Sequence, residues 1–200
     1  MLWTNSEKDI IAHASSCRVC ADKLPAGPKP IFSLHPQAKV ALLSQAPGRI
    51  AHESGEAWKD PGGRRLRAWL GVSDESFFDP RNFAVLPLGL CYPGRGKSGD
   101  LPPRPECAPL WQSRLLSLMP TLKLKILIGG HAMRHHLGKH YGGSVTNTLK
   151  SWEKLSSLGY WPLPHPSPRN RAWLVKLPFF EREILPALKT CIKELLEQQV

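Results

Sequence analysis

Short apolar runs alternate with helical patterns along most of the chain. Runs typical of buried strands occur at residues 40–43, 83–88, 126–128 and 161–163, and Gly or Pro residues follow each of them. The last run is the weakest strand signal, because Pro162 lacks a backbone N–H. Helical stretches lie at about 62–70, 107–118, 131–138, 145–153 and 178–197. This alternation predicts an α/β protein with βαβ connections and a central, mostly parallel four-stranded sheet.

The chain has the size and composition of one folded unit. Its 200 residues are 42% hydrophobic, which suits a single domain spanning residues 1–200. Residues 92–105 are rich in Gly, Pro, Arg and Lys and predict an ordered or semi-ordered loop. The sequence has no apolar run of membrane-spanning length and no signal-peptide pattern at its start. We therefore expect a soluble, cytoplasmic monomer without membrane contact.

The charge balance is strongly basic. Lys and Arg number 27 against 16 Asp and Glu, which gives a net charge of +11. Such an excess favours a polyanionic partner, because neutralising phosphates releases counterions, and nucleic acid fits better than a membrane. A merely solvated basic surface is the alternative.

Four of the five cysteines are spaced like metal ligands. Cys17 and Cys20 form a C-x2-C pair, and Cys91 and Cys107 follow much later, so two distant loops must meet. Four thiolates suit a [4Fe-4S] cluster or a tetrahedral zinc ion, and the residues themselves do not choose between them. Cys191 lies in a predicted helix and is expected to pack as a small hydrophobic residue.

Two short motifs follow the ends of predicted strands. Gln45-Ala46-Pro47-Gly48 follows the first strand, and His165-Pro166-Ser167-Pro168-Arg169-Asn170 follows the fourth. Ligands of open parallel sheets bind beyond the carboxyl ends of the strands. The two motifs are therefore expected to meet at one pocket.

Together, the cysteine spacing and the two motifs resemble the uracil-DNA glycosylase superfamily, most closely its iron–sulfur, family 4-like branch. The second motif is even more similar to that of single-strand-selective relatives. The resemblance covers roughly residues 15–190 and implies a three-layer α/β/α fold. It also implies a [4Fe-4S] cluster of structural role on Cys17, Cys20, Cys91 and Cys107. The implied activity is a DNA glycosylase of base excision repair, which flips a uracil or another deaminated base out of DNA and leaves an abasic site.

The resemblance also implies roles for individual residues. His165 would donate a hydrogen bond to the departing base, where negative charge develops in the transition state. The substrate-binding residues would be Gln45, Ala46, Gly48, Trp58 and Leu88, with the Trp58 indole stacked on the flipped base. Ser167, Arg169 and Asn170 would contact the DNA.

The chain departs from the family pattern at two positions. The water-activating acidic residue would fall near Ala51 and His52. Either His52 or the adjacent Glu53 takes that catalytic role, or the rate depends mainly on binding and on stabilisation of the leaving group. Pro87 stands where relatives that read uracil carry an asparagine, which opens the choice to hypoxanthine or xanthine. Neither motif contains a lysine, which favours a monofunctional enzyme over a Schiff-base lyase, and residues 92–106 lack the histidine that traps the abasic sugar in some relatives.

Two other functions remain alternatives. The first is a nucleic-acid-binding Fe–S protein with a degenerate, inactive pocket. The second is a zinc-stabilised structural or adaptor module.

Overall fold

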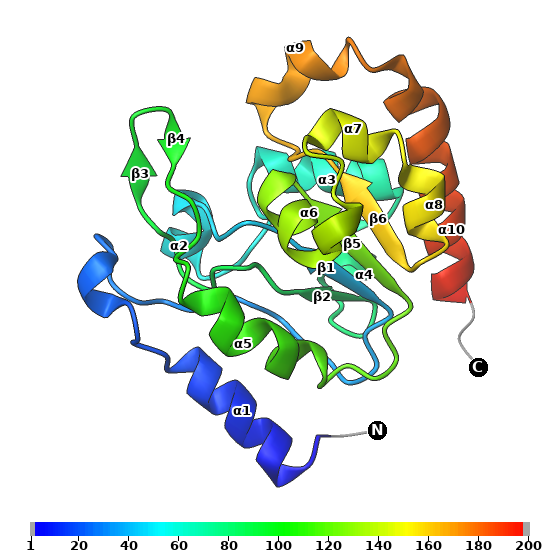
Figure 1. The fold of residues 1–200 in the computed structure, drawn as a ribbon. Helices are drawn as coiled ribbons and strands as arrows, with labels where there is room; N and C mark the ends of the chain where they lie inside the picture. Colours follow the sequence, from blue (N-terminus) through cyan, green and yellow to red (C-terminus); the bar gives the residue numbers. More distant parts are fainter. Residues whose placement is uncertain (1–2, 198–200) are drawn as a thin grey trace.

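A parallel four-stranded sheet lies at the centre of the protein (Figure 1). The computed structural model describes residues 3–197, so the ends of the predicted domain, residues 1–2 and 198–200, lie outside the described residues. Within the described part, the strand order is β2-β1-β5-β6, and every neighbouring pair is parallel. The strands are β1 (Val40–Leu43), β2 (Phe83–Val85), β5 (Leu124–Ile128) and β6 (Tyr160–Leu163). All four predicted strands are confirmed, and β2 ends two residues before Pro87, which cannot donate to a neighbouring strand.

Helices cover both faces of this sheet, and the predicted three-layer α/β/α class is confirmed. The α-helices are α1 (Asn5–Ser15), α2 (Arg49–Ser54), α3 (Pro61–Leu70), α4 (Asp74–Phe78), α5 (Cys107–Leu116), α6 (Gly130–Leu137), α7 (Val145–Leu149), α8 (Trp152–Ser156), α9 (Arg171–Leu174) and α10 (Leu185–Glu197). A π-helical turn at Phe180–Ile184 leads into α10, and short 3-10 turns occupy Ala21–Lys23, Gly138–His140 and Pro168–Asn170.

The alternation of side chains along the strands divides the core into two halves. Val40 and Leu42 of β1 join α3 and α10 on one face, whereas Ala41 and Leu43 join α1, α5 and α6 on the other. All four side chains are fully buried. A strand buried on both faces needs this continuous apolar run, which explains why the pattern alone located β1.

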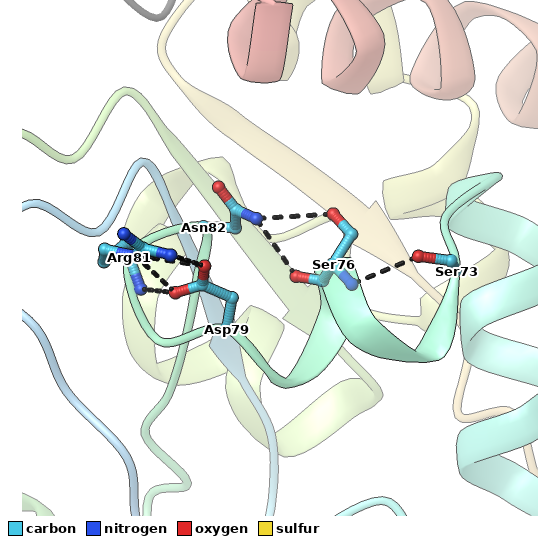
Figure 2. Close-up of polar contacts among 5 residues, drawn as sticks. All are labelled: Ser73, Ser76, Asp79, Arg81 and Asn82. Atoms are coloured by element: carbon cyan, nitrogen blue, oxygen red, sulfur yellow. Dashed lines mark hydrogen bonds and ion pairs between the residues drawn. The ribbon is translucent and has the colours of Figure 1, made fainter.

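A polar turn sets the start of β2 (Figure 2). Ser73 caps α4 by accepting the Ser76 N–H at 3.1 Å. The buried Asn82 amide donates to the Ser76 carbonyl at 3.2 Å, and Arg81 pairs with Asp79 at 2.6 Å. These contacts satisfy the polar groups of the turn that brings Phe83 to the edge of the sheet.

Several parts of the chain differ from the sequence-based expectation or were not predicted, among them the short helices α2, α4 and α9. The expected loop 92–105 contains a small antiparallel hairpin, β3 (Arg95–Gly96) and β4 (Gly99–Asp100). The expected helix 145–153 is split into α7 and α8 at Lys150 and Ser151, where the Ser151 N–H donates to the Thr148 carbonyl at 3.1 Å, three residues back instead of four. Helix α1 was not predicted, although Thr4 and Glu7 form a capping box at its start.

In the described part of the chain, no helix combines the length and apolar character needed to span a membrane.

Candidate functional site

A cavity of about 560 Å³ opens at the carboxyl ends of β1, β2 and β6. Its walls come from the turn after β1, the segment between α2 and α3, Pro87, the hairpin β3–β4 and the loop after β6. The predicted meeting of the two motifs at one pocket is thus confirmed. The lining residues of the two motifs are Gln45, Ala46, Pro47, Gly48, His165, Ser167, Pro168 and Arg169.

The turn after β1 is held by backbone hydrogen bonds to the end of β2. The Leu88 N–H donates to the Ser44 carbonyl and the Gly89 N–H donates to the Gln45 carbonyl, each at 2.9 Å. The Gln45 amide donates to the Leu101 carbonyl at 3.0 Å, which ties the turn to the base of the hairpin. The Gln45 side-chain oxygen is therefore the acceptor that this residue can offer to a ligand.

Trp58 lines the cavity in an unusual backbone conformation. Its φ angle is +64°, a left-handed value that is rare for a large side chain. Gly63 permits this geometry, because a Cβ at that position would lie 1.7 Å from the Trp58 carbonyl oxygen. The buried Arg67 guanidinium donates to the same oxygen at 2.9 Å and pairs with Asp74 at 2.6 Å. Local strain of this kind is maintained by the surrounding contacts, and it sets the indole ring in the cavity wall.

The His165 and Trp58 rings both line the cavity, with 6.0 Å between their centroids. The Ser167 N–H donates to His165 Nδ1 at 3.2 Å, so Nδ1 is an acceptor and the proton of the neutral ring is on Nε2. Burial lowers the pKa of His165, and the carboxylates of Asp60 and Asp100 oppose this shift only in part. The ring therefore presents a neutral Nε2–H donor.

Three contacts fix the loop that carries His165. The Asn170 amide donates to the His165 carbonyl at 2.7 Å, and Arg65 donates to the Ser167 carbonyl at 3.1 Å. Arg169 reaches across the cavity mouth and donates to the Ser98 carbonyl of the hairpin at 2.7 Å. Of the three residues predicted to contact DNA, Ser167 and Arg169 line the cavity, whereas Asn170 is not among the lining residues and holds the loop through the His165 carbonyl. The DNA contacts themselves stay a prediction.

Several predicted site residues do not line the cavity. His52 packs beside Tyr92, with a centroid distance of 5.8 Å, and its Nδ1 is buried without a hydrogen-bond partner among the described residues. Glu53 is exposed and pairs with Arg49 at 2.6 Å. Leu88 is buried behind Pro87, which takes the lining position. Helix α2 lines the cavity through Arg49, Ile50 and Ala51, and His52 and Glu53 are not among the lining residues, so their water-activating role stays a prediction.

Sequence reasoning missed the charged groups that the structure adds to the cavity. Asp60, Asp100, Lys59 and Arg95 line it in addition to Arg49 and Arg169. Asp60 was detectable as a helix cap, since it precedes Pro61 and accepts the Gly63 N–H at 2.9 Å. Asp100 carried no motif signal, because only the hairpin brings it to the cavity.

The four spaced cysteines line a second, much smaller cavity, together with Arg104 and Trp111. The predicted meeting of the two cysteine-bearing loops is therefore observed. Within residues 3–197, no group of three or more His, Cys, Asp or Glu is spaced to hold a metal ion. The meeting of the two loops therefore rests on the cavity that the four cysteines share, and not on a set of ligand positions around a metal. Cys191 lies apart and packs against the core with α10.

The chemistry of these cysteines fits a metal group. Burial raises the pKa of Cys91 to about 11 and that of Cys107 to about 12, so both are neutral thiols unless a cation holds them as thiolates. Fixed N–H donors already face the sulfur atoms. Leu90 donates to Cys107 Sγ at 3.2 Å and Trp111 donates to Cys17 Sγ at 3.4 Å. Such donors stabilise metal-bound thiolates.

The fold and the cavity agree with the comparison against protein families. Residues 32–189 match the family model described as the uracil DNA glycosylase superfamily. This match covers more than half of the chain, including both motifs and the third and fourth cysteines. The chain therefore belongs to the uracil DNA glycosylase superfamily.

Proposed function

We propose that this protein is a monofunctional DNA glycosylase that hydrolyses the N-glycosidic bond of a flipped-out, deaminated base. The observation that carries the proposal is the His165 ring, which presents a neutral Nε2–H to a cavity that also holds the Trp58 indole. When the bond to C1′ breaks, its electron pair leaves with the base. A donor fixed at that position stabilises charge that develops only in the transition state.

The remaining lining residues fit a flipped nucleotide. Trp58 offers an apolar face for stacking, and the backbone turn at Ala46 to Gly48 leaves room for the base edge. Arg49, Arg95 and Arg169 place positive charge at the cavity, which suits the flanking phosphates. Water then adds to C1′, which leaves an abasic sugar.

The base that is removed must be read without an asparagine at position 87. Pro87 lines the cavity there, and the N–H groups of Leu88 and Gly89 are already engaged with carbonyls. The Gln45 side-chain oxygen and the backbone of the turn are the groups left to read the base edge. We therefore propose uracil, hypoxanthine or xanthine as the substrate class.

A hydrolytic rather than a lyase reaction is favoured by the ion pair of the lining lysine. Lys59 lines the cavity, but its side-chain nitrogen is already engaged with the Glu56 carboxylate. A Schiff base requires a neutral amine at C1′. Borohydride should therefore trap no covalent protein–DNA adduct during base release.

We further propose that Cys17, Cys20, Cys91 and Cys107 hold a [4Fe-4S] cluster, with zinc as the alternative. When bound, the group would supply cross-links between the N-terminal segment and the loop that carries the hairpin. Anaerobically purified protein should contain four irons and four sulfides per chain, and Cys107→Ala should lose them. Cys191→Ala, whose thiol lies outside the cysteine cavity, is the matched control. One zinc per chain, without sulfide, would establish the alternative.

The first test of the activity measures base release from oligonucleotides carrying one uracil, hypoxanthine or xanthine, in single and double strands. Wild-type protein should release at least one of these bases, and His165→Ala should not. A second candidate function, a DNA-binding protein with an inactive pocket, is favoured by Pro87 and by the absence of His52 from the cavity lining. Tight, salt-sensitive DNA binding without release of any base would establish that second function and refute the first.

A further inference from the structure

Two carboxylates, Asp60 and Asp100, are among the residues that line the cavity. Asp60 already has a structural task, because its Oδ1 accepts the Gly63 N–H at 2.9 Å and caps α3. Asp100 lies at the end of β4, in the hairpin. The two carboxylates therefore differ in how free they are to act on a ligand.

The hairpin that carries Asp100 is anchored to both motifs. The Gln45 amide donates to the Leu101 carbonyl at 3.0 Å, and Arg169 donates to the Ser98 carbonyl at 2.7 Å. Within the hairpin, the Leu101 N–H donates to the Gly94 carbonyl at 2.9 Å. Asp100 therefore lies between two residues, Ser98 and Leu101, whose carbonyls are hydrogen-bonded to side chains of the two motifs.

The carboxylate itself is oriented toward the turn of the first motif. Tyr92 donates its hydroxyl hydrogen to Asp100 Oδ1 at 3.4 Å. Burial and the charge of Asp100 raise the pKa of Tyr92, so this hydroxyl stays a donor. The other oxygen, Oδ2, lies 3.4 Å from the point where a Cβ on Gly48 would stand. Asp100 as a residue is exposed and lines the cavity.

We propose that Asp100 is the catalytic carboxylate that orients and deprotonates the attacking water. The inference rests on the proposed glycosylase function and assigns to the hairpin a role that neither motif supplies. In the step, the C1′–N bond breaks and its electron pair leaves with the base, which His165 stabilises. The water oxygen bonds to C1′, and one water proton passes to Asp100, which returns it to solvent or to the departed base.

The electrostatic setting supports this role. The charges of Asp60 and Asp100 both oppose the lowering of the His165 pKa by burial, so both carboxylates act electrostatically on that ring. An anionic carboxylate near the sugar also stabilises the positive charge that develops at C1′. Four cations, Arg49, Lys59, Arg95 and Arg169, line the same cavity and offset the repulsion between this carboxylate and DNA.

The test compares single-turnover base release and DNA affinity for wild type, Asp100→Asn, Asp100→Ala and Asp60→Asn. Asp100→Asn keeps the size of the side chain but cannot accept the proton. We expect its rate of release to fall by at least about 100-fold, the usual effect of losing a general base, with DNA binding unchanged or tighter. Formate should restore part of the rate of Asp100→Ala, because a small carboxylate can occupy the space that the substitution opens. Asp9→Asn, on the exposed face of α1, is the charge-matched control and should behave as wild type.

The outcomes separate this proposal from the proposed function. Full activity of Asp100→Asn with active wild type would refute the role of Asp100 and leave the glycosylase proposal intact. A large loss of base release in Asp60→Asn alone would assign the water-activating role to Asp60 instead. A loss in Asp100→Ala that formate does not restore, together with weaker DNA binding, would reduce Asp100 to a structural residue of the hairpin. Absence of release by wild type on every substrate would refute both proposals.

Discussion

Gly63→Ala should damage both stability and activity, although alanine is the better helix former. Gly63 lies in the first turn of α3, where propensity alone predicts that alanine stabilises by about 1 kcal/mol. The structure predicts the opposite sign. A Cβ at position 63 would stand 1.7 Å from the Trp58 carbonyl oxygen, and contacts under 3.0 Å are essentially never observed. The oxygen must therefore move away by at least 1.3 Å, the difference between these two distances.

That displacement has two consequences of measurable size. It breaks the hydrogen bond from the Arg67 guanidinium to the Trp58 carbonyl, now 2.9 Å long, and bonds to charged groups contribute about 1.5–3 kcal/mol. It also shifts the Trp58 indole relative to His165. A misplacement of about 1 Å at a reacting centre can reduce the rate by about 100-fold. We expect a loss of at least about 2 kcal/mol in unfolding free energy and of about 100-fold in base release.

Urea denaturation and single-turnover base release measure the two effects. Gly130→Ala is the matched control, because Gly130 also begins a helix and its added Cβ would meet Val145 at an ordinary 3.4 Å. A Gly63→Ala protein as stable and as active as wild type would refute the argument that Gly63 is required by the close approach of Trp58.

Three further predictions concern other parts of the structure. Arg67→Lys should lower the unfolding free energy by about 2 kcal/mol, because arginine reaches the Trp58 carbonyl through Nη1 and Asp74 through Nε, whereas lysine has one nitrogen on a differently shaped side chain. Arg64→Lys on the exposed face should not lower it, and equal stability of the two variants would contradict this. Burial lowers the pKa of His136 from 6.5 to about 4, so between these values the unfolded chain binds a proton that the folded one does not, and stability falls as the pH falls. From pH 7 to pH 4.5 this loss should be on the order of 2–3 kcal/mol, and His136→Leu should flatten it; a pH dependence that survives the substitution would assign it to other groups. Asn170→Ala should slow base release by about tenfold with DNA affinity retained, because it removes the 2.7 Å bond to the His165 carbonyl; a loss of affinity alone would instead indicate a direct DNA contact.

The local patterns of the sequence located most of the regular elements for a clear reason. Strands such as β1 are buried on both faces and must be continuously apolar, and helices such as α3 carry a capping aspartate and a following proline. The same local reasoning missed α1, whose apolar residues are few. It also joined α7 and α8 into one helix, because the change of backbone hydrogen bonding at Ser151 leaves no mark on the periodicity of apolar residues.

The candidate site was predictable where one short motif carries the chemistry. His165, Ser167 and Arg169 line the cavity because the whole motif follows the end of β6. Trp58, which the resemblance assigned to the substrate site, lines it as well. For His52 and Glu53, the position in the sequence did not predict whether the side chain lines the cavity. Neighbouring residues on a helix point in different directions, so a place near the expected position did not put either side chain in the cavity.

The sequence by itself predicted the strands of the parallel sheet, the two motifs at its carboxyl edge and the spacing of the four cysteines, because each can be recognised from short patterns and from the order of residues along the chain. Only the tertiary structure decided that the proton of the neutral His165 ring is on Nε2, that Gly63 and Arg67 hold Trp58 in a left-handed conformation, and that a hairpin brings Asp100 to the cavity. Each of these depends on contacts between side chains and backbone groups from separate segments, and their orientation is set by packing rather than by local pattern.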